Sequence, residues 1–156
     1  LTQDFLLPVL AKELHLFYSS TIERLALGGP DLVERERAAL GWDHAEASGH
    51  VMFGWSFPDD LVCCVRLHHR PDAVTTDPRL SRSAAAAAAL AALLPGPVRQ
   101  CPDGAEQLDA LLRERYGLNA AELAAAVDAQ MAEQMRPAPG DVPLAERLRQ
   151  AMPAAV

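Results

Sequence analysis

Hydrophobic residues recur along most of the chain at the three- and four-residue spacing of an α-helix, and Pro and Gly residues separate the periodic segments. This punctuation predicts helices of ordinary length. No segment shows the strict apolar and polar alternation that is typical of a half-buried strand. The predicted helices cover residues 2–14, 16–27, 31–40, 44–55, 58–69, 80–94, 104–116, 120–135 and 143–151.

The fold class that follows is all-α, with a bundle of about seven to eight helices. We expect residues 1–135 to form one helical domain, followed by a linker and a short C-terminal helix in residues 136–156. The alanine-rich residues 84–89 are predicted to lie in a core helix, because small side chains allow neighbouring helices to approach closely.

The composition is that of a soluble globular protein, with 50% hydrophobic and 22% charged residues in 156. Its longest apolar run is shorter than the roughly 20 residues that cross a bilayer, and no signal peptide is recognisable. Because the chain does not begin with Met, we expect it to be a piece of a longer protein. The net charge of −7 offers no basic stripe for nucleic acid. The three cysteines cannot form a paired framework and lack metal-site spacing, which favours a reduced cytoplasmic protein with buried thiols. Cys63 has apolar neighbours and is expected in a packing role, with a redox sensor as the alternative.

Three of the five histidines fall in two neighbouring predicted helices. Helical spacing places His44 on one face with Trp55, which we expect to be a buried anchor. It also directs His68 inward and turns His69 about 100° aside. Two inward histidines could be metal ligands, because neutral imidazole suits Zn, Fe, Mn or Ni. The alternative is that they are polar core residues, hydrogen-bonded to backbone or water.

Other polar residues carry weaker signals. His15 is expected at the surface or its boundary, and His50 falls on a different helix face from His44, so neither is expected to be a ligand. The charged run of residues 34–37 is expected to be a solvated helix face, with a docking patch for a partner as the alternative. No P-loop, hydrolase elbow or dinucleotide-binding motif occurs.

The order of residues from 41 to 71 resembles the HDOD family. Residues 41–51 are similar to its G-x-D-H-A-E-x-G signature, although Ser48 stands where the family usually has glycine, so that its hydroxyl needs a hydrogen bond. Residues 55–58 are similar to W-x-x-P and residues 68–71 to H-H-x-P. The resemblance is specific across residues 4–72 and looser to about residue 135. It implies an HD-domain-like helical bundle, related to metal-dependent phosphohydrolases.

The resemblance also implies which metal ligands are missing. The catalytic relatives carry a His-Asp doublet on an early helix, and the matching residues here are Gln3 and Asp4. A further Asp is expected from a later helix, but residues 80–98 contain no Asp, Glu or His. A partial set of ligand candidates remains, so we expect no catalytic residue and no bound metal. These candidates are Asp4, His44, His68 and His69.

HDOD domains are regarded as non-catalytic modules of bacterial signalling proteins. The resemblance therefore implies a cytoplasmic regulatory module without a cofactor, whose partners are other proteins or covalently linked signalling domains. Neither nucleic acid nor a membrane is expected as a partner, and a homodimer is left open. One alternative is a metal-dependent HD-type phosphohydrolase with a reduced ligand set, which would use Mn, Fe or Zn. Another is a sensor that holds a nucleotide or other anion.

Overall fold

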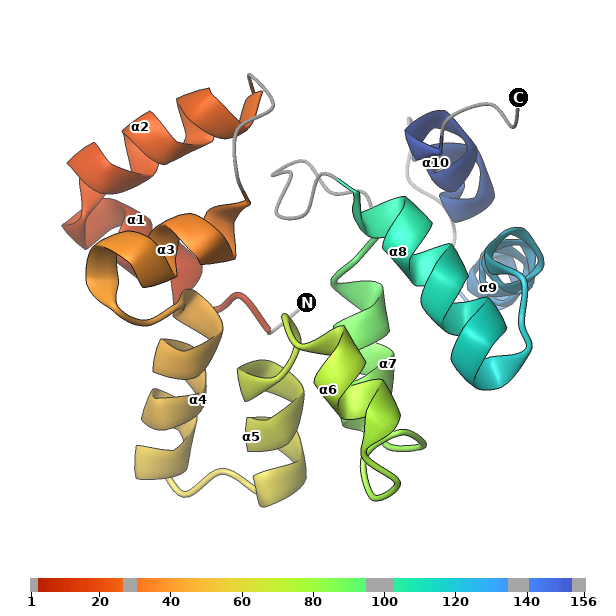
Figure 1. Ribbon diagram of the computed structural model, residues 1–156, viewed down its shortest axis with the longest axis horizontal. Coiled ribbons are helices and arrows are strands. Elements are labelled where there is room, and N and C mark those ends of the chain that lie inside the picture. Colours follow the sequence, from red (N-terminus) through yellow and green to blue (C-terminus); the bar gives the residue numbers. More distant parts are fainter. Residues whose placement is uncertain (1–2, 27–30, 95–102, 135–140, 153–156) are drawn as a thin grey trace. The chain divides into compact units, whose positions relative to one another are not determined.

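The structure is a computed structural model that describes residues 3–26, 31–94, 103–134 and 141–152. These residues form helices and turns without any strand, which confirms the predicted all-α fold (Figure 1). None of their helices is long and apolar enough to span a lipid bilayer. The chain divides into two compact units, Leu1–Pro102 and Asp103–Val156. The boundary that we place at residue 135 from the sequence stays a prediction.

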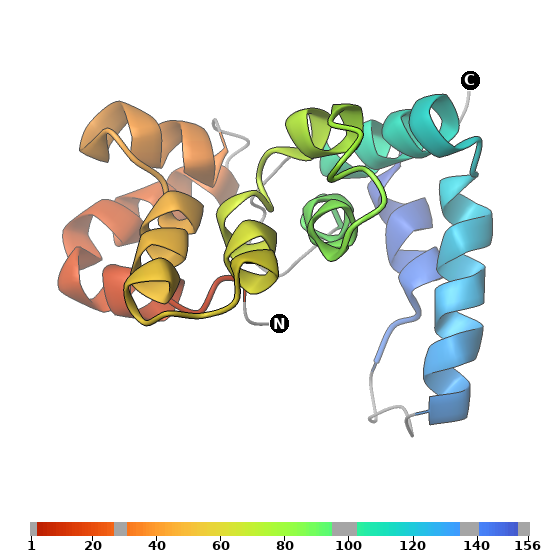
Figure 2. The ribbon, with the colours of Figure 1, turned by 90° about the horizontal axis from the view of Figure 1, so that it is seen from below.

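The helices of the first unit pack mainly against their neighbours in sequence. They are α1 (Leu7–Glu13), α2 (His15–Ala26), α3 (Leu32–Leu40), α4 (His44–Gly54), α5 (Asp59–Arg66), α6 (Pro71–Thr76) and α7 (Ala84–Ala91). Helix α2 contacts both α1 and α3, while α4 packs along α5, and α7 contacts both α5 and α6. Figure 2 shows α4 and α5 side by side.

Local sequence signals set the start of α4. The N-cap carboxylates of Asp31 and Asp43 accept hydrogen bonds from the backbone N–H three residues further on, at 2.7 and 2.8 Å. Gly41 closes α3 with φ +79°, a left-handed conformation that glycine adopts without steric cost. These signals fix His44 as the first residue of α4.

Among the helix boundaries that differ from the prediction, two set the positions of site residues. Helix α1 begins at Leu7 rather than at residue 2, so Asp4 lies in a turn before it. Helix α5 ends at Arg66 rather than at residue 69, and α6, which we did not predict, begins at Pro71. Proline disrupts a helix interior but fits the first turn of a new helix, so the chain turns before Pro71 and then starts α6. With α6, the described part of residues 1–135 contains α1 to α9, more than the seven to eight helices expected.

Trp55, which we predicted to be a buried anchor, is 65% exposed. The prediction is wrong because α4 ends at Gly54, and helical spacing no longer sets the direction of the following side chain. The chain turns at Ser56, whose φ is +58°. The ring of Trp55 lies near Phe5 and Phe57, with centroids 6.5 Å from each.

Small apolar clusters hold the first unit together. The predicted core position of the alanine-rich helix is confirmed for one face of α7. One cluster comprises Val74, Ala85, Ala86 and Ala89, packed against Cys63, Cys64, Leu67 and Leu80. A second comprises Tyr18 and Leu32 with Leu7, Leu10, Ala11, Leu14 and Phe17, and a third Met52, Val62 and Val65 with Phe5.

Gly49 allows α4 and α5 to approach closely. A Cβ atom at Gly49 would lie 2.7 Å from the Cβ of Arg66, whereas one at Gly54, in the same helix, would meet nothing within 4 Å. Both Gly→Ala changes should stabilise the helix by about 1 kcal/mol, because alanine has a higher helix propensity than glycine. Gly49→Ala also overpacks the interface between α4 and α5, which should cost roughly 1–3 kcal/mol of stability. We expect Gly49→Ala to be less stable than Gly54→Ala by about 1–3 kcal/mol in urea unfolding. Equal stabilities would show that the two helices separate without cost.

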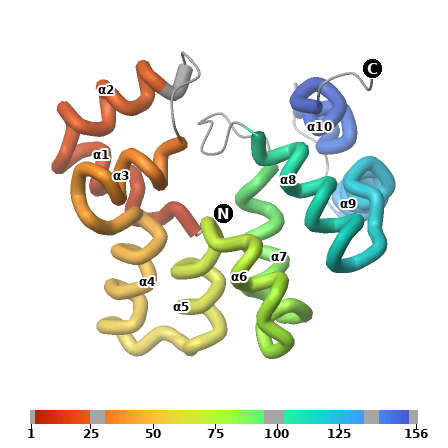
Figure 3. The backbone as a smooth tube through the Cα atoms, in the orientation of Figure 1, coloured from red at the N-terminus to blue at the C-terminus, as the bar shows by residue number. Residues whose placement is uncertain are grey.

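The described part of the second unit contains α8 (Gly104–Leu111), a π-helical turn η1 (Leu112–Tyr116), α9 (Ala120–Gln134) and α10 (Leu144–Ala151). Figure 3 traces the backbone through these elements. Gly117 closes η1 at φ +64°, and Asn119 accepts a hydrogen bond from the N–H of Ala121 at 2.8 Å. Helix α10 packs on α9, where the Asp128 carboxylate accepts hydrogen bonds from the first N–H groups of α10.

Candidate functional site

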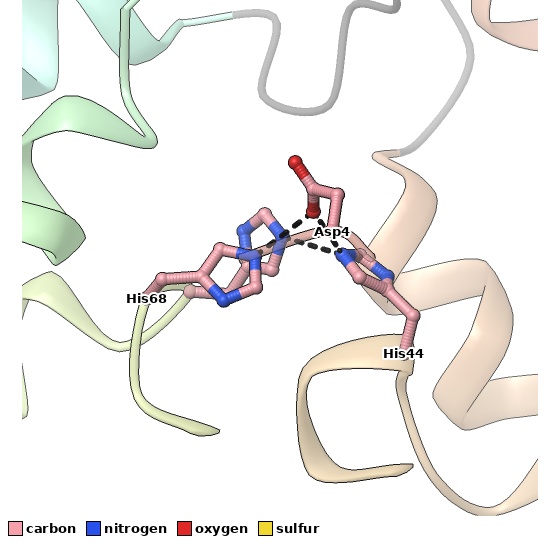
Figure 4. A group of neighbouring side chains, drawn as sticks. Asp4, His44 and His68 are labelled. Atoms are coloured by element: carbon pink, nitrogen blue, oxygen red, sulfur yellow. Dashed lines mark hydrogen bonds and ion pairs between the residues drawn. The ribbon is translucent and has the colours of Figure 1, made fainter. Parts of the chain in front are cut away.

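The structure brings together the four metal-ligand candidates that the sequence singles out. Asp4 lies in the turn before α1, His44 begins α4, and His68 and His69 lie in the turn after α5. One ligand atom from each side chain lies within 4.8 Å of the others. In Figure 4 the Asp4 carboxylate is directed toward the rings of His44 and His68. Segments far apart in the sequence therefore share one polar site.

The contacts within the site are made by the Nε2 atoms of the imidazole rings. Asp4 Oδ1 lies 3.1 Å from Nε2 of His44 and 3.2 Å from Nε2 of His68. Nε2 of His69 lies 2.9 Å from Nε2 of His44. The side chains of His44 and His68 are fully buried, whereas that of Asp4 is 32% exposed. The site thus has two buried imidazoles, His44 and His68, while His69 and the Asp4 carboxylate are partly exposed.

His69 belongs to the site, contrary to the prediction that it points about 100° away from His68. That angle applies to successive residues of a helix, but α5 ends at Arg66. In the turn that follows, the rings of His68 and His69 lie with their centroids 4.0 Å apart. The early end of α5 is therefore what adds a third imidazole to the site.

In the rings of His44 and His68, the other nitrogen, Nδ1, contacts an acceptor outside the site. Nδ1 of His68 lies 2.6 Å from the backbone carbonyl oxygen of Val65. Because a carbonyl oxygen only accepts hydrogen bonds, this nitrogen is the donor and carries the proton. Nδ1 of His44 lies 2.7 Å from Oε2 of Glu36. Both rings therefore turn Nε2 toward the site.

Glu36 is the functional residue that we did not predict. The charged run around it was expected to be solvated, but Glu36 is fully buried. Its Oε1 accepts a hydrogen bond from the Tyr18 hydroxyl at 2.6 Å, and its Oε2 accepts one from the backbone N–H of His44 at 3.0 Å. The signal that could have found it is its spacing, since Glu36 follows the buried Leu32 and Val33 by four and three residues, on the same helix face.

The buried charges act strongly on one another. Burial opposes the protonation of His44, but hydrogen bonds to Asp4 and Glu36 outweigh it and raise the pKa of His44 to about 9. Burial alone would raise the pKa of Asp4, yet hydrogen bonds to His44 and His68 hold it far below its usual range. Burial, aided by the charges of His68 and His44, lowers the pKa of His69 to about 2. At neutral pH the site therefore pairs a His44 imidazolium with an Asp4 carboxylate beside a neutral His69.

The other polar residues considered in the sequence have ordinary surroundings. His15 is exposed, as expected, His50 is exposed on α4 away from the buried His44, and Cys63 is half-buried against the cluster on α7. Burial raises the pKa of the neighbouring Cys64 thiol. The hydroxyl of Ser48 is buried, and among the described residues it has no hydrogen-bond partner, so the bond that we expected for it is not found there.

The donor types of the site fit a single transition-metal ion. Imidazole nitrogen and carboxylate oxygen are ligands that zinc, iron and manganese accept. His44, His68 and His69 would hold such an ion through Nε2, and Asp4 through a carboxylate oxygen. A bound ion would supply a fixed positive charge and Lewis acidity.

Comparison with known proteins assigns the first part of the chain. No curated protein and no solved structure matches the chain. The family model of the HDOD domain matches residues 3–71, a segment that contains Asp4, Glu36, His44, His68 and His69. The resemblance seen in the sequence motifs is thereby confirmed, because residues 3–71 of this chain match the HDOD domain family.

Proposed function

We propose that the chain is a non-catalytic regulatory module of a bacterial signal-transduction protein, and that it acts in the cytoplasm through protein contacts. The observation that carries this proposal is the number of donors at the site, where four ligand atoms converge within 4.8 Å. Four protein ligands are typical of closed, structural metal sites. A catalytic zinc site instead keeps three protein ligands and leaves one position for water or substrate.

The surroundings of the site also favour a non-catalytic role. A hydrolytic centre with two metal ions needs additional ligands to hold both ions. Glu36 places a buried carboxylate beside His44, but both of its oxygens already accept hydrogen bonds, from Tyr18 and from His44. Helix α7 consists of alanine and leucine, and neither residue type can bind a metal. These features do not favour the alternative of a metal-dependent phosphohydrolase.

An exposed apolar surface supports action through protein contacts. The end of α4, the connection that follows it and the first turn of α5 present four large apolar side chains that are 42–68% exposed, and we call these residues the aromatic turn. Exposed apolar groups that gather on one surface typically mark interaction sites. Asp59 and Asp60 are exposed at the start of α5, so a partner with apolar and basic side chains fits best. The aromatic turn comprises Phe53, Trp55, Phe57 and Leu61.

Site-specific crosslinking tests this proposal. A photo-reactive amino acid at position 57, in the protein expressed in its own cells, is expected to give covalent adducts with a protein partner. Trp55→Ser should abolish the adducts while the far-UV circular dichroism of the purified protein stays unchanged, because the Trp55 side chain is 65% exposed. The same probe at position 50, an exposed site on α4, serves as the matched control and should give none.

A hydrolysis assay decides between the two functions. The purified chain with added Zn²⁺, Mn²⁺ or Fe²⁺ is expected to hydrolyse bis(p-nitrophenyl) phosphate no faster than the metal ions alone. Metal-dependent turnover that disappears in His68→Ala would overturn the non-catalytic proposal. Equal adducts at positions 50 and 57 would remove the support for the aromatic turn.

A further inference from the structure

We propose that Asp4, His44, His68 and His69 form a binding site for one divalent transition-metal ion of the zinc type, with Glu36 and the Val65 carbonyl as outer groups that orient its ligands. This inference goes beyond the proposed function and does not depend on it. It differs from the expectation from the sequence that the partial ligand set binds no metal, an expectation that rests on the missing histidine and aspartate.

The first support is the convergence of donors of the right kind. Three imidazole nitrogens and one carboxylate oxygen lie within 4.8 Å of one another. Imidazole prefers zinc and similar transition metals, whereas magnesium and calcium prefer oxygen ligands. His44 and His68 are fully buried, whereas Asp4 and His69 are partly exposed, so an ion would reach the site from the side of these two residues.

The second support is the orientation of the rings. A metal-binding histidine usually donates its other N–H to a carboxylate or a backbone carbonyl, which fixes the ring and its tautomer. Nδ1 of His44 meets the Glu36 carboxylate at 2.7 Å, and Nδ1 of His68 meets the Val65 carbonyl oxygen at 2.6 Å. Two rings thus show, independently of each other, the outer contacts of a metal ligand.

The third support is the crowding of acceptor atoms at the centre of the site. Nε2 of His44 faces both Asp4 Oδ1, at 3.1 Å, and Nε2 of His69, at 2.9 Å. Asp4 Oδ1 also lies 3.2 Å from Nε2 of His68, whose Nδ1 already carries a proton. In the imidazolium form of His44, the proton on Nε2 can be donated to Asp4 or His69, but with its proton on Nδ1 the Nε2 lone pair of His68 faces the Asp4 carboxylate. One ion bound by the four atoms would use all of these lone pairs.

The consequence of binding is a link between segments that are distant in the sequence. Asp4 precedes α1, His44 begins α4, and His68 and His69 follow α5. An ion held by these residues would tie the N-terminal turn to the α4 and α5 pair. Metal binding of this kind stabilises the folded state, because the unfolded chain lacks a preformed site.

The test is titration of the metal-free protein with Zn²⁺ alone. The protein is purified without a histidine tag, stripped with a chelator and followed by mass spectrometry of metals and by thermal unfolding. We expect one Zn²⁺ per chain and, at about 100 times the dissociation constant, a rise in the melting temperature of about 5–10 °C. Mg²⁺ at the same concentration should cause no rise, because it prefers oxygen ligands.

Variants that keep the shape of the site identify the ligands. Asp4→Asn and His69→Gln should each weaken Zn²⁺ binding at least about 100-fold, more than the loss of an outer contact usually does. His50→Gln, on the exposed face of α4, is the matched control and should bind like the wild type. Circular dichroism of the metal-free variants checks the fold. If Asp4→Asn fails to fold, the Zn²⁺ affinity of His69→Gln tests the proposal.

Three results would overturn the proposal. The first is no Zn²⁺ binding by the wild-type chain, and the second is full binding by both Asp4→Asn and His69→Gln. The third is loss of binding in Cys63→Ser or Cys64→Ser, which would assign the ion to the half-buried thiols instead. None of these results depends on whether the chain hydrolyses a phosphodiester, so the failure of this proposal is distinguishable from the failure of the proposed function.

Discussion

Glu36→Ala is expected to lower the free energy of unfolding by about 3–5 kcal/mol, which is the usual cost of removing one partner of a buried ion pair. Glu36 is fully buried, and its carboxylate accepts hydrogen bonds from the Tyr18 hydroxyl and the backbone N–H of His44 and contacts Nδ1 of His44. Alanine would leave all three groups buried without this partner. Urea unfolding of the metal-free protein measures the loss.

The matched control for this change is Glu34→Ala, on the same helix. Glu34 is exposed in the first turn of α3, so its replacement should cost less than about 1 kcal/mol through the helix dipole. Alanine is the best helix former, so helix propensity cannot explain a large loss at either position. Equal small losses in the two variants would contradict the central role that we assign to Glu36.

The sequence predicts much of the fold and part of the site. Helix positions follow from apolar spacing and from local caps. Asp is a preferred N-cap residue, and the Asp43 carboxylate accepts a hydrogen bond from the backbone N–H of Glu46 in α4. The inward position of His44 and His68 also follows from spacing, and both are fully buried. These features are predictable because they depend on residues within a few positions of one another.

The rest of the site depends on where helices begin and end and on contacts between side chains of different helices. The position of His69 is set by the end of α5 before Pro71, and that of Asp4 by the late start of α1 at Leu7. A shift of a few residues in a helix boundary reverses the direction of a side chain, as it does for Trp55. Glu36 escaped prediction for another reason, because its neighbours are charged and its partner Tyr18 lies in a different helix.

Glu36 connects the stability of the fold with the chemistry of the site. The same carboxylate caps the first N–H of α4 and holds the His44 ring with Nε2 toward Asp4. Its hydrogen bond from Tyr18 anchors it to α2. The hydrogen bonds of His44 to Asp4 and Glu36 overcome the effect of burial and raise the pKa of His44 to about 9. A substitution that keeps the shape of Glu36 but removes its charge should therefore separate its two roles.

Glu36→Gln is expected to weaken Zn²⁺ binding by about 10–100-fold, the usual effect of losing an outer contact to a metal-binding histidine. The amide oxygen of glutamine can still accept the N–H groups of His44, and its NH₂ group can donate to the Tyr18 hydroxyl, so the fold should be kept. The change removes the negative charge that makes the His44 ring a stronger ligand. Competition with a chelator of known affinity measures the dissociation constant.

A second measurement distinguishes positioning of His44 from a general loss of structure. Nitrogen-15 NMR of the imidazole rings is expected to show the Nδ1–H tautomer for His44 and His68 in the zinc-bound wild type, because both Nδ1 atoms face hydrogen-bond acceptors. Glu36→Gln should alter the signals of His44 and leave those of His68 unchanged, since the Val65 carbonyl is untouched. Glu34→Gln should change neither the affinity nor the spectra. Unchanged affinity in Glu36→Gln, with His44 signals like those of the wild type, would show that the carboxylate has a structural role alone.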